Sequence, residues 1–330
     1  MHVRCARIAR RIDSSPRTCY LIFTEEVAVR LKLAGSILSL VLAGLACSAS
    51  AQDQEEVQIV VEEVSPKVYM LTGRGGNIGV SVGEDGAFLI DDQYAPMTPA
   101  IREAVAEITD EPIRFVFNTH WHEDHTGGNE DFSEAGSLIV AHDNVRKRLA
   151  AGQLMSFLGQ ESNVPPAPDV ALPVVTFDHA VTFHINGDEL RAFHVLNAHT
   201  DGDAIVHFKE ADVVHMGDIY FNGFYPFIDA SSGGSLEGMI AAVEQALELI
   251  GEDTAVIPGH GPLSNRQELE SYREMLAGVH ERIGALIDEG LSLDEIKAQR
   301  PTDEFDEEWG GGFIAPEQLV EMVYSQMTGK

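Results

Sequence analysis

Cysteine is almost absent from this chain of 330 residues, and its three copies, Cys5, Cys19 and Cys47, all lie within the first 51 positions. The 279 residues that follow contain no thiol, which excludes a disulfide framework and a thiolate metal ligand in that part of the chain. No internal repeat is present. A Gly-x-Ser-x-Gly motif is also missing, so the sequence offers no signature of a serine nucleophile.

Basic residues are few. The chain has 22 Lys and Arg against 53 Asp and Glu, and its first 51 residues hold seven of the basic and three of the acidic ones. Residues 52–330 therefore carry 15 basic and 50 acidic side chains, a formal net charge of −35. A surface this acidic repels nucleic acid, so it argues against a nucleic-acid substrate and favours a small-molecule substrate.

Long hydrophobic runs are limited to one stretch, Leu33–Ala46, which follows Arg30 and Lys32. Residues 49–51, Ala-Ser-Ala, then supply a small-x-small cleavage site, so residues 1–51 are expected to be a signal peptide and leader. Cleavage would leave a periplasmic protein with no stable membrane span. A membrane anchor is the alternative, although the run is short for one. The scattered arginines of residues 1–29 are an odd preface to a signal peptide and suggest a start codon placed too far upstream.

The most informative stretch is residues 119–128, Thr-His-Trp-His-Glu-Asp-His-Thr-Gly-Gly. It follows Ile113–Asn118, an apolar and aromatic run that predicts a buried strand, and its two glycines predict a turn. The cluster therefore lies where a strand gives way to a loop, a common location for reactive side chains held on a rigid scaffold. A surface loop that happens to be rich in histidine is the alternative, and such clusters are far more often metal sites.

Imidazole and carboxylate are the ligands that Zn²⁺ prefers when no thiolate is present. His120 and His122 are two residues apart, so in an extended segment they point the same way and can bind one ion. Asp124 and His125 follow where the loop turns. Because one ion cannot easily use all four from so short a loop, the spacing predicts two zinc ions close together.

This His-x-His-x-Asp-His run resembles the signature of the metallo-β-lactamase superfamily, whose remaining ligands are a histidine, an aspartate or cysteine, and a last histidine. The chain has His199, Asp218 and His260 in that order, each after an apolar run that ends in a turn. The resemblance covers roughly residues 57–276.

The resemblance implies a zinc-dependent hydrolase with two ions per chain and metal-activated water that attacks a carbonyl. It implies that Asp124 orients this nucleophile as well as binding metal, and that Asp218 bridges the two ions. The implied ligands are His120, His122 and His199 for the first ion, with a position left for water, and Asp124, His125 and His260 for the second.

Export favours β-lactam hydrolysis, that is, a β-lactamase with small-molecule antibiotics as substrates. Two departures weaken it: Asp218 stands where the related β-lactamases carry a cysteine, and Phe221 stands where they carry a lysine that holds the β-lactam carboxylate. A thioesterase or lactonase similar to glyoxalase II is the alternative, although glutathione thioesters fit an exported, acidic chain poorly. A redox or binding protein of the same superfamily is the third hypothesis, and nothing after Leu276 resembles the flavin domain of the redox members.

Two strand-rich halves, each closed by helices, predict an α/β fold for residues 52–330, expected to be one catalytic domain. The resemblance implies the same fold, a four-layer αβ/βα sandwich with the metals at one edge between the halves. The expected strands are 57–64, 67–72, 78–82, 87–90, 113–118 and 138–141, then 180–185, 189–196, 204–209, 213–216 and 254–257. The expected helices are 98–109, 142–150, 235–250, 263–289, 292–299 and 316–327.

Four further expectations concern the loops and the remaining polar residues. Residues 73–77 predict a mobile glycine-rich loop that is no phosphate cradle, because no helix follows. Residues 152–173, with four prolines, predict an irregular segment that serves as a lid or as a plain linker. Asp91 and Asp92 are expected to be structural. The other eight histidines are expected to be core or surface residues: His2, His142, His179, His184, His194, His207, His215 and His280.

Overall fold

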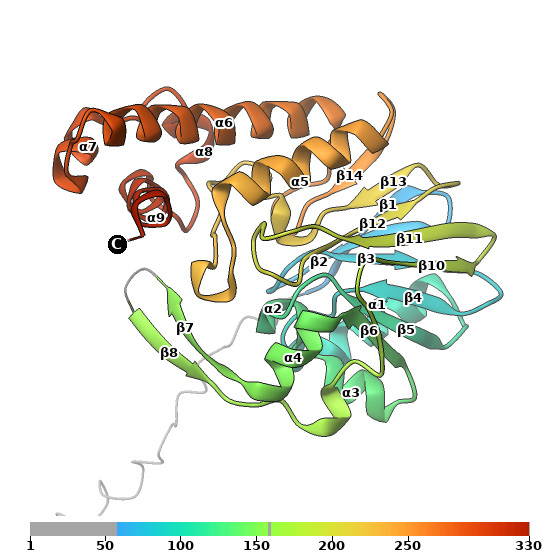
Figure 1. Cartoon of the computed structure of the whole chain (residues 1–330). Helices are drawn as coiled ribbons and strands as arrows, with labels where there is room; N and C mark the ends of the chain where they lie inside the picture. The colour runs from blue at the N-terminus through green and yellow to red at the C-terminus, as the bar shows by residue number, and fades with distance from the viewer. Residues whose placement is uncertain (1–57, 158–159, 330) are drawn as a thin grey trace, which may run out of the picture. The chain divides into compact units, whose positions relative to one another are not determined.

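Two β-sheets pack face to face, and helices cover the outer face of each one (Figure 1). A computed structural model describes residues 58–157 and 160–329, which belong to a unit that runs from Glu55 to Lys330. The signal peptide and leader expected for residues 1–51 lie outside the described residues. Among the described residues, no helix combines the length and the apolar character that crossing a membrane requires.

The first sheet has seven strands. Its first four strands pair antiparallel, and the remaining ones continue the sheet in parallel, so the strand that leads into the histidine cluster is buried between two neighbours. The order is β1 (Val60–Ser65), β2 (Val68–Thr72), β3 (Ile78–Ser81), β4 (Ala87–Ile90), β5 (Ile113–Asn118), β6 (Leu138–His142) and β9 (Val175–Phe177).

The second sheet has six strands and is antiparallel except for one parallel pair, β13 with β14. The order is β10 (Ala180–Ile185), β11 (Asp188–His194), β12 (Ala204–Phe208), β13 (Val213–His215), β14 (Ala255–Ile257) and β15 (Ser264–Asn265).

The alternation of side chains along the strands builds three cores, one between the sheets and one on the outer face of each sheet. In β4, Phe88 and Ile90 point between the sheets, while Leu89 points to the helices on the other side. In β12, Val206 joins the core between the sheets and Ile205 joins the core under the second set of helices. Because central strands such as β4 and β12 are apolar on both faces, both sheets need a helical layer outside them.

Helices supply that layer on both sides, which confirms the predicted four-layer αβ/βα sandwich (Figure 1). The first sheet is accompanied by α1 (Thr98–Ile108), α3 (Asn129–Glu134) and α4 (Asp143–Ala151), and the second by α5 (Leu236–Leu249), α6 (Arg266–Asp288), α7 (Leu293–Gln299) and α9 (Pro316–Thr328). Short helical turns complete the described chain: η1 (Ala95–Met97), α2 (Glu123–Thr126), η2 (Asp169–Ala171), η3 (Gly217–Ile219), η4 (Ala230–Ser232) and α8 (Asp306–Trp309).

The structure corrects three expectations. The segment 152–173, predicted to be irregular, contains an antiparallel hairpin of β7 (Gln153–Phe157) and β8 (Gln160–Val164). Its prolines follow the second strand instead of interrupting it. The helix predicted from residue 263 begins at Arg266, because Ser264 and Asn265 pair with β14 and the Asn265 side chain accepts a hydrogen bond from the backbone of Glu268. The three-residue strand β9 was missed, since it is too short to show a period.

The topology brings several loops to one edge of the sandwich. Strands β5, β13 and β14 all end there, so the segments that begin at Thr119, Met216 and Pro258 are neighbours in space. The backbone amide of Ala204 donates to the carbonyl of Thr119 at 2.9 Å, which ties the two sheets together at this edge.

Candidate metal centre

All seven residues predicted to bind metal meet at this edge of the sandwich, although they span 140 positions from His120 to His260. They form two groups, and within each group one potential ligand atom per residue lies within 4.8 Å of the others. The first group is His120, His122, His199 and Asp218, and the second is Asp124, His125 and His260. These groups correspond to the two predicted ligand sets, with Asp218, predicted to bridge them, placed in the first; metal binding by these residues stays a prediction.

In the first group, three imidazole nitrogens converge on one point. Nε2 of His120 lies 3.1 Å from Nδ1 of His122, and that Nδ1 lies 2.9 Å from Nε2 of His199. All three rings are buried. Whether these nitrogens hydrogen-bond to one another or face a cation depends on which ring nitrogen of each histidine carries its proton.

The outer nitrogens of two rings settle their protonation. Nε2 of His122 lies 3.0 Å from Oδ2 of Asp229, and Nδ1 of His199 lies 2.8 Å from the carbonyl oxygen of Phe227. Both partners are acceptors only, so each outer nitrogen carries the hydrogen. In a neutral ring held this way the inner nitrogen carries the lone pair, the arrangement by which second-layer acceptors orient metal-binding histidines.

The outer nitrogen of His120 is held by a hydroxyl group. Its Nδ1 lies 3.1 Å from Oγ1 of Thr119, and that hydroxyl donates to Oδ2 of Asp91 at 2.8 Å. The Thr119 oxygen is thus free to accept from Nδ1 of His120. Three lone pairs then point at one another, which no hydrogen bond among them can satisfy and which a bound cation does.

The pKa values of the first group agree with this assignment. Burial lowers the pKa of His199 to about 4, against the opposing attraction of the Asp218 carboxylate. Burial and then the nearby His125 hold the pKa of His120 well below its usual range. Both rings are therefore neutral at pH 7, the form in which imidazole binds metal.

The second group centres on His125. Its Nδ1 lies 2.8 Å from Oδ2 of Asp91, and its Nε2 faces Oδ2 of Asp124 at 3.5 Å and Nε2 of His260 at 3.4 Å. Burial lowers the pKa of His125, but the carboxylates of Asp218, Asp124 and Asp91 outweigh it and raise the pKa well above its usual value. The site thus attracts positive charge at Nε2, a proton or a metal ion.

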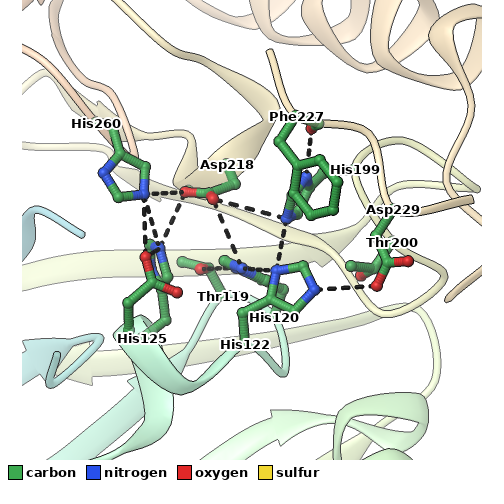
Figure 2. Close-up of polar contacts among 12 residues, drawn as sticks. Thr119, His120, His122, His125, His199, Thr200, Asp218, Phe227, Asp229 and His260 are labelled. Atoms are coloured by element: carbon green, nitrogen blue, oxygen red, sulfur yellow. Dashed lines mark hydrogen bonds and ion pairs between the residues drawn. The ribbon is translucent and has the colours of Figure 1, made fainter. Parts of the chain in front are cut away.

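Asp218 lies between the two groups. Its Oδ2 is 3.8 Å from Nε2 of His120 and 3.6 Å from Nε2 of His199. Its Oδ1 is 3.0 Å from Nε2 of His125 and 3.4 Å from Nε2 of His260. Each carboxylate oxygen therefore faces a different group (Figure 2).

The Asp218 carboxylate is surrounded by histidine nitrogens. It is buried, and its Oδ1 makes no well-directed hydrogen bond to any described residue. Burial raises its pKa, but His125, His260 and His120 outweigh that effect and hold the pKa well below its usual range. A buried ionised oxygen without a hydrogen bond is costly unless a cation pairs with it, so the donor set fits metal ions.

The glycine-rich loop, residues 73–77, is packed directly against the second group. Its Gly76 amide donates to the Asp124 carbonyl at 3.0 Å, and Nε2 of Gln93 donates to the Gly76 carbonyl at 2.8 Å. A Cβ at Gly76 would lie 2.0 Å from Cε1 of His125. The loop predicted to be mobile is therefore fastened at Gly76, and its glycines permit this close approach.

Sequence reasoning missed three supporting residues. Asp229, fully buried, holds His122 and also accepts hydrogen bonds from the hydroxyls of Ser231 and Ser232. Gln93 anchors the glycine-rich loop, and Phe227 supplies the carbonyl behind His199. The stretch Asp-Ala-Ser-Ser could have indicated a turn at Asp229, but nothing in it pointed to His122, 107 positions away.

Phe221, which stands where related β-lactamases carry a lysine, packs against a predicted ligand. Its ring is fully buried and stacks nearly parallel on His260, with ring centroids 5.4 Å apart and an interplanar angle of 9°. The amide of Asn222 donates to the His260 carbonyl at 2.9 Å. Phe221 thus positions a predicted ligand and offers no charge to a substrate.

The two aspartates expected to be structural lie behind the site. Asp91 accepts from the Thr119 amide at 2.7 Å as well as from its hydroxyl, and it holds His125. Asp92 is fully buried, its Oδ1 accepts from the amide of Gly128 at 2.9 Å, and burial first of all raises its pKa well above the usual value. Neither belongs to the two candidate metal groups.

A pocket of about 670 Å³ opens onto the site. His122, Asp124, Asp218 and His260 contribute to its lining, so both groups are accessible from it. The rest of the lining is largely apolar and includes Trp121, Leu149, Met155, Val164, Phe227 and Phe313. The hairpin predicted as a lid or linker therefore forms part of the pocket wall through Met155 and Val164.

Comparison with known protein families decides the family. The family description "Metallo-beta-lactamase superfamily" matches residues 71–278, which is more than half of the chain. The chain belongs to the metallo-beta-lactamase superfamily. The resemblance drawn from the sequence motif is thereby confirmed.

Among curated proteins, the chain is similar to a probable metallo-hydrolase, YqgX, of Bacillus subtilis (strain 168). The two are 29% identical over 192 residues, which cover 53% of this chain and 83% of the relative. It is also similar to a hydroxyacylglutathione hydrolase of Polaromonas sp. (strain JS666 / ATCC BAA-500), with 27% identity over 202 residues, 61% of this chain and 67% of the relative. These relatives place the chain among the metallo-hydrolases of the superfamily.

Solved structures share the fold. A metallo-beta-lactamase from Pontibacter korlensis aligns with a TM-score of 0.55 and 21% identity, over 67% of this chain and 99% of the other. The sec-alkylsulfatase Pisa1 from Pseudomonas sp. aligns with a TM-score of 0.62 and 21% identity, over 83% of this chain and 50% of the other. At such identities the likeness concerns the fold alone.

Proposed function

We propose that this metallo-hydrolase binds two zinc ions and hydrolyses a carbonyl ester bond of a small molecule. The observation that carries the proposal is the position of Asp218, whose two carboxylate oxygens face the two histidine groups separately. Zinc suits a donor set of five imidazoles and two carboxylates without thiolate.

In this proposal His120, His122 and His199 would hold the first ion and Asp124, His125 and His260 the second, with Asp218 available to both. Zinc bound there would supply Lewis acidity and would lower the pKa of bound water from about 15.7 to about 7. The supporting acceptors behind the rings, Asp229 and Asp91 among them, keep the inner nitrogens aimed at the ions.

Asp124 has the role of orienting the attacking water. It is half-buried, lines the pocket, and its Oδ2 lies 3.3 Å from Nε2 of His260. Burial raises its pKa, but His125 and His260 outweigh this and lower it, so Asp124 is a carboxylate at pH 7. It can then accept a hydrogen bond from water and leave the water lone pair directed at the carbonyl carbon.

For the substrate we place a thioester or lactone first. Asp218 stands where the related β-lactamases have a cysteine. Phe221, packed on His260, stands where they have the lysine that holds the β-lactam carboxylate. The curated relatives named hydroxyacylglutathione hydrolase support the same class.

β-Lactam ring opening is the second candidate, the one that the leader sequence favours. An amide in a strained four-membered ring presents the same carbonyl to the same nucleophile. The apolar pocket of about 670 Å³ is large enough for either class of small molecule.

A substrate screen tests the proposal. The purified protein, loaded with zinc, is assayed against an acyl thioester, an acyl lactone, an aryl ester, a penicillin and a carbapenem. The proposal predicts that kcat/KM is highest for the thioester or lactone and that a chelator abolishes turnover. Turnover of none of the five above that of the metal-stripped protein would contradict the hydrolase proposal, and a preference for the penicillin or carbapenem would reverse the order of the two candidates.

A further inference from the structure

Arg74 places a positive charge in the lining of the pocket. It lies in the glycine-rich loop between β2 and β3, its side chain is exposed, and it contributes to the pocket lining. Among the described residues, no carboxylate lies within ion-pairing distance of its guanidinium group. Its positive charge stands out beside a site whose pocket lining also contains the carboxylates of Glu123, Asp124 and Glu130.

The second arginine of the pocket is occupied. Nε of Arg148 donates to Oδ1 of Asp201 at 2.6 Å and its Nη2 donates to Oδ2 at 2.7 Å, a bidentate pair. Its Nη1 donates to the side chain of Gln153. Arg148 therefore holds α4 and the hairpin in place and has little charge to offer a ligand.

The backbone beside Arg74 is fixed next to the catalytic groups. Gly75 lies so close to Asp124 that a Cβ on it would be 2.6 Å from the Asp124 carbonyl oxygen, and Gly76 is hydrogen-bonded to that same oxygen. Arg74 thus starts from a backbone that packs on the second histidine group. The fixed backbone keeps the Arg74 side chain within the pocket lining, next to Asp124.

The pocket wall formed by α4 and the hairpin of β7 and β8 is apolar, in contrast to the charged side with Arg74. Leu149 and Met155 line the pocket there, Val164 follows on β8, and Phe313 contributes from the segment before α9. Phe313 is 52% exposed. Apolar side chains left exposed around a pocket indicate an apolar part of the ligand.

We propose that Arg74 binds a carboxylate of the substrate while an apolar part of the same molecule packs against Met155, Val164 and Phe313. This inference rests on the proposed hydrolase function and names its substrate class, a carbonyl ester or thioester with one negative charge and one apolar group. Guanidinium binds carboxylate through paired N–H donors. Arg74 would thus supply the positive charge for a substrate carboxylate that Phe221 cannot supply.

A matched pair of esters tests the charge. 4-Nitrophenyl hemiglutarate carries a carboxylate at the end of its acyl chain, and 4-nitrophenyl pentanoate is its neutral counterpart of similar length. We expect Arg74→Ala to lower kcat/KM for the hemiglutarate about tenfold and for the pentanoate less than about twofold. The control is Arg102→Ala, which removes an exposed arginine of α1 outside the pocket lining and should leave both values unchanged.

Ligand binding provides a readout that does not depend on turnover. Calorimetry measures the affinity of the zinc-loaded protein for p-toluenesulfonate, an anion with an apolar ring, and for the neutral methyl p-tolyl sulfone. We expect Arg74→Ala to weaken sulfonate binding about tenfold and to leave sulfone binding unchanged, with Arg102→Ala behaving as the parent protein. Added salt should reduce the difference.

The two measurements separate this inference from the function on which it rests. If no ester is hydrolysed but sulfonate binding depends on Arg74, the hydrolase proposal fails and the anion site stands. If esters are hydrolysed and Arg74→Ala changes neither the charge preference nor the sulfonate affinity, the anion site is refuted and the hydrolase proposal stands.

Discussion

The carboxylate of Asp229 holds the imidazole of His122 from behind, with Oδ2 of Asp229 3.0 Å from Nε2 of the ring. This pair fixes the hydrogen on Nε2 and leaves Nδ1 as the nitrogen that meets His120 and His199. His125 is held in the same way by Asp91, through the opposite ring nitrogen. The two groups are thus oriented by carboxylates that are not themselves predicted ligands.

Asp229→Asn should weaken metal binding at the first group. The amide places an N–H donor or a weaker oxygen acceptor behind His122, so the ring is held less firmly in the required tautomer. We expect a loss of metal affinity of about tenfold to a hundredfold. Competition with a chromophoric chelator measures it. Glu130→Gln is the control, since it removes the same charge from an exposed residue that lines the pocket. An affinity of the Asp229 variant equal to that of the control would contradict this role.

Gly76→Ala should damage the second group without touching a ligand. The added Cβ would lie 2.0 Å from Cε1 of His125, so either the ring or the loop must move. We expect a destabilisation of about 1–3 kcal/mol and loss of metal from that group. Gly311→Ala is the control, because a Cβ there meets nothing within 4 Å and the backbone is not left-handed. Thermal unfolding and metal analysis give the comparison, and a Gly76 variant with the metal content of the Gly311 variant would count against the packing argument.

Much of the site could be predicted because most of its metal-binding residue types lie close together in the sequence. Four predicted ligands occupy the six positions from His120 to His125, so their shared role shows in the sequence itself. The layers of the fold were predictable for a related reason, since strands such as β4 and β5 are short apolar runs that end in turns. The helical period was likewise visible in α1, where Ile101, Ala104 and Val105 are buried.

The rest could not be predicted because it depends on tertiary contacts between distant positions. His122 and Asp229 are 107 positions apart, and only the folded chain brings them together. The Gln93 side chain donates to the backbone carbonyl of Gly76, and a contact to the backbone does not depend on the residue type at that position. The hairpin of β7 and β8 is rich in polar residues and is followed by prolines, so local propensity favoured an irregular segment.

A pair of histidines away from the two candidate metal groups should make folding sensitive to acid. His142 and His194 stack with centroids 3.8 Å apart and an angle of 10°. Burial and then the neighbouring His194 lower the pKa of His142 to about 4. The native state thus keeps His142 neutral, while the unfolded chain protonates it near its ordinary pKa of about 6.5. Its contribution to stability is complete above pH 6.5 and is lost as the pH falls towards 4.

We therefore expect His142→Asn to flatten the loss of unfolding free energy between pH 7 and pH 5, relative to the parent protein. Denaturant titrations at several pH values measure this slope. His179→Asn serves as the control, because His179 is exposed and should leave the slope unchanged. Equal slopes for the His142 variant and the parent protein would show that the stacked pair has no such effect.

Export is a separate prediction from the leader sequence. The apolar run Leu33–Ala46 followed by Ala-Ser-Ala at 49–51 places the cleavage after Ala51. In a Gram-negative host, the protein recovered from the periplasm should begin at Gln52 on N-terminal sequencing. Recovery from the cytoplasm alone, with the leader still attached, would contradict this expectation.

The central claim is that Asp218 joins two zinc ions in one centre. Asp218→Ala removes one ligand from each ion. The second ion, which then has only Asp124, His125 and His260, should be lost first, because its group is the more exposed of the two. Turnover should fall by orders of magnitude, because the groups that stabilise the transition state are no longer preorganised. Asp218→Cys should retain both ions, since thiolate is a good zinc ligand.

The direct measurement is the zinc content per chain, by elemental analysis, of the parent protein and these two variants, with hydrolysis of the best substrate assayed in parallel. The account predicts close to two zinc ions for the parent protein and for Asp218→Cys, and close to one for Asp218→Ala with turnover strongly reduced. A parent protein that holds one ion at full activity, or an Asp218→Ala variant that keeps two ions and near-native turnover, would contradict it.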